Sequence, residues 1–151
     1  MIVKSQSGNV VNVVNATNAQ CFRKDIEVDW RSWCPERGSV ILVNFKSDGM
    51  DSEIRGLHPA VVLSNNINNR YSGIINVAPL TSSKTKSNIP VHVKVGVENG
   101  LKTESIICLE LTDNISKRRC LINGRFMIIC KLSEQKMEEV DKKLKLQMGL
   151  I

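Results

Sequence analysis

The amino-acid sequence predicts a mainly β protein (α+β) that is closed by one C-terminal helix. Short runs rich in Val and Ile recur along the chain between segments of Gly, Pro, Asn and charged residues, a pattern typical of strands. Aromatic residues make up only 4% of the 151 residues, so branched aliphatic side chains must form most of the core. Only one segment has the spacing of an amphipathic helix. These three observations define the fold class.

Residues 1–36 are predicted to form an N-terminal extension, and residues 37–151 the domain itself. A short strand is expected at residues 10–14. Trp30 and Trp33 stand just before a proline, which would end a helix. We expect both Trp side chains to pack the extension onto the domain rather than to stack on bases.

Six apolar runs of the domain have the length and composition of strands, and they lie at residues 38–45, 60–64, 74–80, 89–95, 105–111 and 124–130. A polar loop with two glycines follows the first run and is expected to be mobile. Another polar loop joins the runs at 60–64 and 74–80, and a basic turn is expected at 113–119. Such strands predict a small, strongly curved antiparallel sheet.

The C-terminal segment 133–149 is the only clear helix in the sequence. Ser133 suits the N-cap and Glu134 suits the first turn. One face of the helix is apolar and is expected to cover the sheet. Its residues are Met137, Val140, Leu144 and Met148.

Composition limits the function classes. The formal net charge of +6 favours an acidic or polyanionic partner. No stretch has the length of a membrane span and the N-terminus has no secretory pattern, so we expect a cytoplasmic protein without membrane association. The cysteines are odd in number and none forms a C-x-x-C pair, so the sequence predicts reduced thiols and no metal or redox cofactor. They are Cys21, Cys34, Cys108, Cys120 and Cys130.

A series of motifs resembles MazF/PemK-type toxins from about residue 37 to residue 150. The segments RGSVILVNF, LHPAVVLSNNINNRYS, VAPLTSS, IPVHV and SIICLE follow one another in the family's order. The family's R-G-[DE]-V, R-P-V-L-V, N-R, terminal T, P-x-H-V and S-x-x-x-x-E elements fall on residues 37–40, 58–62, 69–70, 81, 90–93 and 105–110. Shorter pieces of the sequence resemble the related ToxN-type ribonucleases.

The resemblance implies an SH3-like small β-barrel of the PemK/CcdB toxin type. It also implies a metal-independent, sequence-selective endoribonuclease (mRNA interferase) that cleaves single-stranded RNA, forms a homodimer and is neutralised by an antitoxin protein. Residues 1–36 have no counterpart in the compact toxins.

The resemblance carries the family's functional Thr onto Thr81, whereas the family's functional Arg falls on His58. Histidine is a chemically sensible replacement, because it can act as base or acid near neutral pH. Arg55, three residues earlier, could supply the missing guanidinium to a phosphate. We therefore expect His58, Thr81 and Arg55 to be the catalytic residues. Their alternative roles are a hydrogen-bonded surface histidine, a strand-ending turn and a solvated arginine.

The residues expected to bind substrate are polar or basic, and they are Ser82, Ser83, Lys84, Lys86, Arg70 and Arg119. Lys117 and its basic neighbours are expected to extend this positive track along one groove, although a run of charge is usually a solvated face. Glu110 is expected to pair with a base such as Arg119, and His92 to point outward as a structural or peripheral residue.

Two function classes remain open at the level of sequence. One is an active endoribonuclease. The other is a catalytically altered domain that binds nucleic acid, an antitoxin or a protein target without cleaving RNA. A purely structural domain is disfavoured by the net charge and by the polar strand ends.

Overall fold

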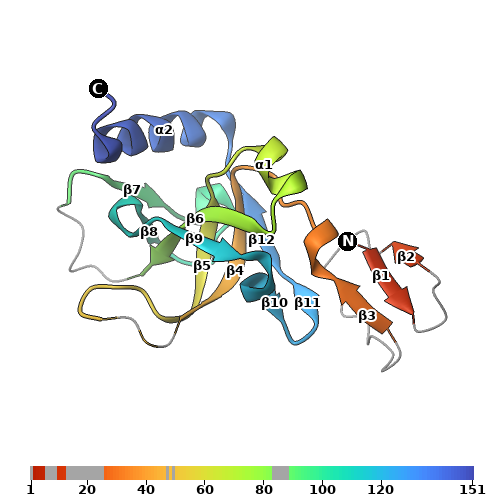
Figure 1. Ribbon diagram of the computed structural model, residues 1–151. Coiled ribbons are helices and arrows are strands. Elements are labelled where there is room, and N and C mark those ends of the chain that lie inside the picture. The colour runs from red at the N-terminus through yellow and green to blue at the C-terminus, as the bar shows by residue number, and fades with distance from the viewer. Residues whose placement is uncertain (1, 6–9, 13–25, 47, 49, 83–88) are drawn as a thin grey trace.

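The computed structural model describes residues 2–5, 10–12, 26–46, 48, 50–82 and 89–151 (Figure 1). Its strands are β1 (Ile2–Ser5), β2 (Val10–Asn12), β3 (Ile26–Asp29), β4 (Ser39–Phe45), β5 (Gly56–Val62), β6 (Ile74–Thr81), β7 (His92–Val95), β8 (Ser105–Cys108), β9 (Asp113–Ser116), β10 (Leu121–Ile122), β11 (Arg125–Phe126) and β12 (Ile128–Lys131). Its helices are α1 (Asn66–Tyr71) and α2 (Glu134–Met148), with 3-10 turns η1 (Trp30–Ser32), η3 (Val97–Asn99), η4 (Leu109–Leu111) and η5 (Lys117–Cys120).

The main sheet is antiparallel and has the strand order β12-β4-β5-β6-β8-β7, with β9 also paired to β6. Strand β6 connects its two halves. The first residues of β6 pair with β9, whereas Leu80 and Thr81 pair with β8. Strand β5 pairs with β6 only from Val77 to Pro79, so the sheet divides beyond Pro79 and curves into a partly closed barrel. The predicted mainly β fold with a C-terminal helix is confirmed.

Hydrophobic residues form a core on each face of the central strands. The α2-side core contains Ala78 and Leu80 of β6 together with Met137 and Val140 of α2. The Trp33-side core, on the opposite face, is built from alternate residues of β4, β5 and β6 together with Trp33, Cys120 and Phe126. Because neighbouring strand residues point to opposite faces, the position of a residue in a strand determines which core it faces.

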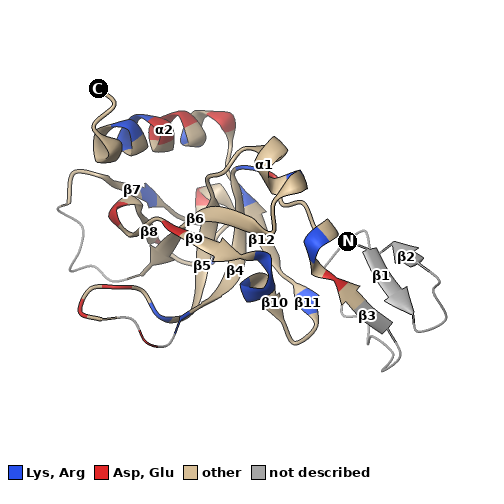
Figure 2. Cartoon of the chain, in the orientation of Figure 1, with Lys and Arg blue, Asp and Glu red and all other residues tan. Residues whose placement is uncertain are grey.

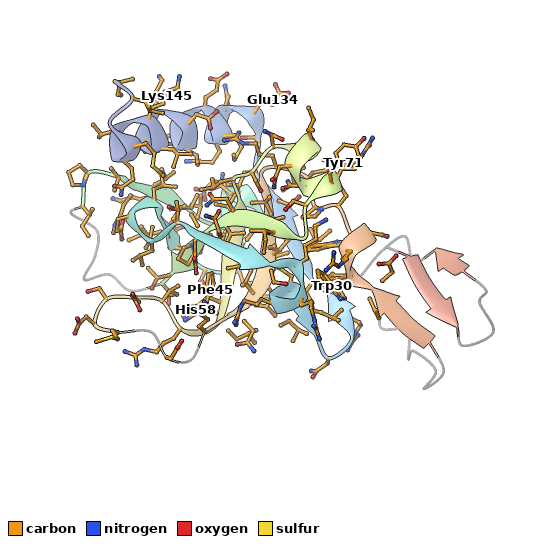
Figure 3. All side chains as sticks on the ribbon, viewed as in Figure 1. Trp30, Phe45, His58, Tyr71, Glu134 and Lys145 are labelled. Carbon is orange, nitrogen blue, oxygen red and sulfur yellow. The ribbon has the colours of Figure 1, made fainter. Side chains whose placement is uncertain are left out.

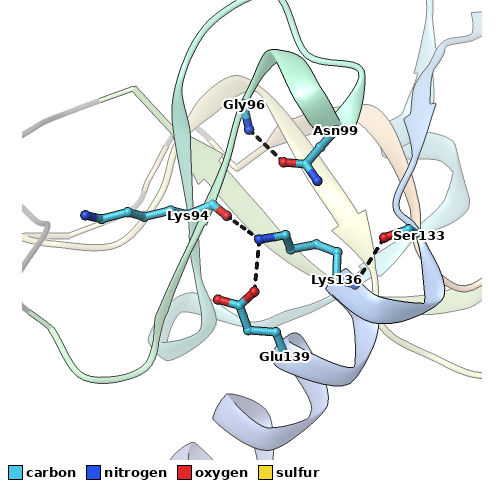
Figure 4. Close-up of polar contacts among 6 residues, drawn as sticks. All are labelled: Lys94, Gly96, Asn99, Ser133, Lys136 and Glu139. Atoms are coloured by element: carbon cyan, nitrogen blue, oxygen red, sulfur yellow. Dashed lines mark hydrogen bonds and ion pairs between the residues drawn. The ribbon is translucent and has the colours of Figure 1, made fainter.

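Helix α2 begins and ends as its sequence predicts. The side chain of Ser133 accepts a hydrogen bond from the backbone N–H of Lys136, and Gly149 ends the helix in a left-handed conformation. The ammonium group of Lys136 donates to the backbone carbonyl of Lys94 on β7 at 3.0 Å and pairs with Glu139 at 2.9 Å (Figure 4). These contacts fix the helix against the edge of the sheet.

The predicted apolar face of α2 is correct for Met137, Val140 and Leu144 but wrong for Met148. Met137 and Val140 are buried and Leu144 packs against the α2-side core. Met148, the last residue of the helix, is 54% exposed.

Two connecting segments differ from the prediction. The segment between β5 and β6 contains helix α1 rather than only a loop, because the side chain of Asn65 caps it by accepting from Asn68 N–H at 2.8 Å. The expected turn at 113–119 is strand β9 followed by η5, because Asp113–Ser116 pairs with β6.

The N-terminal residues of the described part form a small sheet with the order β2-β1-β3. Strand β2 overlaps the strand expected at residues 10–14, of which residues 13 and 14 lie outside the described residues. The expected packing of the two Trp side chains is observed. The ring of Trp33 stacks on Phe126 with centroids 4.1 Å apart, and Trp30 packs against the Trp33-side core.

Lys117 corrects a further expectation, because it is fully buried and cannot belong to a solvated positive track. Its ammonium group donates to the carbonyls of Asn69 at 2.6 Å and Arg31 at 3.0 Å. Burial lowers the pKa of Lys117, with smaller opposing effects from nearby groups such as Cys34 and Asp29. Lys117 thus joins η5, α1 and the chain just before the domain.

The described cysteines are thiols rather than disulfides, as expected; they are Cys34, Cys108, Cys120 and Cys130. Burial raises the pKa of Cys120 to about 12 and also raises the pKa of Cys130, so these two thiols stay protonated near neutral pH. None of the helices in the described part of the chain has the length and apolar character needed to cross a bilayer.

Candidate functional site at the opening between β5 and β6

His58 and Thr81 lie where β5 and β6 separate. The last pair between the two strands is Ala60 with Pro79, and the same register continued by two residues would set His58 opposite Thr81. Instead, Thr81 pairs with Ile106 on β8. By strand alternation from the Ala60–Pro79 pair, both side chains belong to the face of the Trp33-side core. Both residues therefore lie just beyond the point at which β5 and β6 stop pairing, on the same face of the sheet.

The imidazole of His58 is hydrogen-bonded to the backbone of the residues that lead into β5. Its Nε2 lies 2.9 Å from the backbone carbonyl oxygen of Arg55, and a carbonyl can only accept, so Nε2 carries the proton. The ring lies beside Phe45, with centroids 6.4 Å apart (Figure 3). Partial exposure leaves the ring accessible to a ligand. In this tautomer Nδ1 is the nitrogen that can accept a proton.

Arg55 accepts the hydrogen bond from His58 through its backbone carbonyl, and Arg55 is exposed to solvent. Thr81 is partly buried at the end of β6, and Ser82 follows it in an exposed position. Ser83, Lys84 and Lys86 lie outside the described residues.

The two predicted arginine ligands occupy different ends of the sheet. Arg119 of η5 donates to the carbonyl of Asn44 at 3.3 Å, one residue along β4 from Val43, which pairs with His58. Arg118 and Arg119 line a hollow of about 350 Å³ there. Arg70 is exposed on α1, which lies just before the first residue of β6. Thr81 is the last residue of β6, so the two residues stand at opposite ends of this strand. Eight strand residues span roughly 23 Å, so the structure does not bring Arg70 to the opening.

A larger pocket, of about 460 Å³, lies between the β4–β5 loop and the chain that joins β8 to β9. Its charged lining is mostly acidic and consists of Lys46, Asp48, Glu53, Glu110 and Asp113. Figure 2 shows acidic and basic residues along the loop and basic residues at η5. Negative potential in this pocket disfavours a phosphate and favours a cation, so the arginines of η5 offer the better surface for an RNA backbone.

His92 and Glu110 form a buried pair that the sequence analysis did not foresee. His92 was expected to point outward and Glu110 to pair with Arg119, and both expectations are wrong. The side chain of His92 is only 3% exposed, and its Nε2 lies 2.8 Å from Glu110. The only sequence signal for this pairing is that both residues stand in family motifs on neighbouring segments.

The architecture is a small, partly closed antiparallel β-barrel with a C-terminal helix. Residues 36–148 match the family described as PemK-like, MazF-like toxin of type II toxin-antitoxin system, and the chain belongs to this family. Among its relatives, the Endoribonuclease MazF of Staphylococcus epidermidis is 36% identical over 115 residues, which are 76% of this chain and 91% of that protein.

Solved structures share the fold. MazF from Deinococcus radiodurans (form I) aligns with a TM-score of 0.62 and 22% identity, covering 78% of this chain and 98% of that chain. An endoribonuclease in complex with its cognate antitoxin, from a mycobacterial species, aligns with a TM-score of 0.61 and 20% identity, covering 78% and 97%. The family predicted from the motifs is confirmed.

Proposed function

We propose that this toxin is an endoribonuclease that cleaves single-stranded RNA at selected sequences without a metal ion. The observation that carries the proposal is the placement of His58 and Thr81 on one face where β5 and β6 separate. The relative from Staphylococcus epidermidis, which is named an endoribonuclease, supports the reaction class.

In the proposed reaction the ribose 2′-oxygen attacks the adjacent phosphorus, and the bond from phosphorus to the 5′-oxygen breaks. His58 takes the 2′-hydroxyl proton on Nδ1, since Nε2 donates to the Arg55 carbonyl. The leaving 5′-oxygen takes a proton from solvent water, and the product is a 2′,3′-cyclic phosphate with a free 5′-hydroxyl. General base catalysis by a positioned histidine contributes about 10²- to 10⁴-fold to such a rate.

The remaining predicted residues act on the phosphate and the RNA backbone. The Thr81 and Ser82 hydroxyls donate to a non-bridging oxygen, and the guanidinium of Arg55 neutralises developing charge. Arg119 holds a neighbouring phosphate. Ser83, Lys84, Lys86 and Arg70 stay predictions as RNA ligands.

The proposal includes the biological setting. A protein antitoxin neutralises the toxin, as supported by the mycobacterial endoribonuclease solved with its cognate antitoxin. The toxin acts as a homodimer in the cytoplasm, and residues 1–36 extend the domain formed by residues 37–151. Light scattering at micromolar concentration should give a dimer mass, and a monomer mass would contradict this part of the proposal.

Cleavage of a long RNA by purified protein in excess EDTA tests the activity. His58→Ala should lower the rate by at least about 100-fold. Leu57→Ala is the matched control, because Leu57 is the adjacent residue of β5, is 52% exposed and points to the opposite face. The pH–rate profile of His58→Arg should be flatter than that of the wild type, because an arginine stays charged at every pH at which the protein is folded.

If His58→Ala cleaves RNA at the wild-type rate, His58 is not the general base, and Arg55 is the next residue to test. The second candidate function is a domain that poisons by binding, which the replacement of the family's Arg by His58 favours. Toxicity in cells that survives the combined His58→Ala and Thr81→Ala substitutions would support that alternative and refute the nuclease.

A further inference from the structure

Three side chains with different donor atoms converge beside the opening. His92 of β7 and Cys108 of β8 are direct partners across the two strands, so their side chains lie on the same face. Glu110 follows two residues later in η4. One donor atom from each residue lies within 4.8 Å of the other two. The donors are an imidazole nitrogen, a thiol sulfur and a carboxylate oxygen.

The group is buried, and one nitrogen of its imidazole lacks a hydrogen-bond partner among the described residues. The residue Cys108 is 1% exposed, and the side chains of His92 and Glu110 are 3% and 25% exposed. One ring nitrogen of His92 contacts the carboxylate. Both carboxylate oxygens of Glu110 lie 2.8 Å from His92 Nε2, whereas His92 Nδ1 has no hydrogen-bond partner among the described residues. A buried imidazole nitrogen without a partner is unusual in a folded protein, and a bound ion is one arrangement that would satisfy it.

An access route for a cation lies beside the group. Glu110 lines the acidic pocket of about 460 Å³, which also contains Asp48, Glu53 and Asp113. Negative potential in a pocket raises the local concentration of cations. The partly exposed carboxylate of Glu110 joins this pocket to the buried imidazole and thiol.

We propose that His92, Cys108 and Glu110 bind one divalent transition-metal ion of the zinc type, with the fourth position taken by water from the acidic pocket. Nitrogen, sulfur and oxygen donors together select zinc over magnesium or calcium, which prefer oxygen alone. Tetrahedral ligand atoms at zinc lie about 3.3–3.8 Å apart, so a separation between two donor atoms, now within 4.8 Å, needs to shorten by about 1.5 Å at most.

Binding forms a metal–sulfur bond and releases the thiol proton of Cys108 to solvent. The weak contact of this thiol with the Ile106 carbonyl, now 3.8 Å, is replaced. The site joins His92, the first residue of β7, to η4 and takes no part in the proposed RNA cleavage. The sequence analysis missed it because His92 and Cys108 are far apart in the chain and meet only across the two strands.

Cobalt titration of the purified full chain tests the proposal. Cobalt(II) replaces zinc in such sites, and a bound thiolate gives a near-ultraviolet charge-transfer band. One equivalent of cobalt should produce this band, and zinc should abolish it. Zinc should also raise the melting temperature in a concentration-dependent way, because an ion that binds only the folded state stabilises it.

Cys108→Ala should eliminate the cobalt band, and Glu110→Gln should weaken cobalt binding at least tenfold. Cys34→Ala is the matched control, because Cys34 is an exposed free thiol, and this variant should bind as the wild type does. Absence of the band in the wild type, or its loss in Cys34→Ala alone, would overturn the proposal. If Cys108→Ala does not melt cooperatively, Glu110→Gln decides, and unchanged affinity in that variant refutes the site.

Discussion

Replacing Lys117 by Met tests the buried ammonium group that joins three parts of the chain. Methionine keeps the length and apolar bulk of lysine but removes the N–H groups that bond the carbonyls of Asn69 and Arg31. The buried Asn69 carbonyl then loses this bond at a cost of about 1–3 kcal/mol, and the more exposed Arg31 contact adds about 0.5–1.5 kcal/mol. Removing a buried charge offsets part of this sum. We expect a net loss of about 1–3 kcal/mol.

Urea unfolding at pH 7 measures this loss. The midpoint should fall by roughly 1 M with an unchanged slope, since slopes of small proteins are about 1–3 kcal/mol per M. Lys142→Met is the control, because Lys142 is exposed on α2, and its effect should stay within about 0.5 kcal/mol. A Lys117→Met protein as stable as the wild type would refute the role given to this amine.

The difference in stability between the wild type and Lys117→Met should depend on pH. Burial lowers the pKa of Lys117 in the folded state below its value in the unfolded chain. Between these two pKa values the unfolded chain binds more protons, so wild-type stability rises with pH there. The stability of the wild type relative to Lys117→Met should therefore increase as the pH approaches the usual lysine pKa of about 10.4. A decrease over that range would contradict the assigned burial.

Two further predictions concern packing. Met137→Ala should lower the free energy of unfolding by about 2–5 kcal/mol in thermal or urea unfolding, because Met137 is 9% exposed. Met148 is 54% exposed, so Met148→Ala should be nearly neutral. Equal effects of the two substitutions would contradict the described buried face of α2. Gly100→Ala should destabilise more than Gly149→Ala by at least about 1 kcal/mol in the same assay. Both glycines have positive φ, but only at Gly100 would the new Cβ lie 2.8 Å from Cys130 Cβ, and equal losses would show that the clash relaxes freely.

The strands and the long helix were predictable because each has a local pattern that burial alone produces. Strand β6 is apolar along almost its whole length, since it has a core on each face and a strand on each side. Helix α2 has both its cap and its apolar spacing in sequence. Helix α1 was missed because its six residues, NINNRY, contain little apolar periodicity, although Asn65 is a good N-cap.

Errors of site prediction came from contacts between distant segments. Strand alternation correctly sets His92 opposite to its valine neighbours, but it cannot show that Glu110 covers that face. In the same way, no local pattern indicates that carbonyls from residues 31 and 69 meet the ammonium group of Lys117. The sequence could place His58 and Thr81 on strands β5 and β6, because these strands are adjacent along the chain and each has its own apolar pattern, whereas the catalytic role of the two residues stays a prediction.

The contact of Lys136 with the Lys94 carbonyl has a consequence for synthesis of the chain on the ribosome. Strand β7 is an edge of the main sheet, and an unprotected edge can pair with another chain and start aggregation. Helix α2 lies against this edge through the contact of Lys136 with the Lys94 carbonyl (Figure 4). Its residues, Glu134–Met148, are translated well after those of β7. During that interval the edge lacks its cover. A nascent toxin therefore passes through a stage in which β7 is open to chaperones or to neighbouring nascent chains, and completion of α2 ends it.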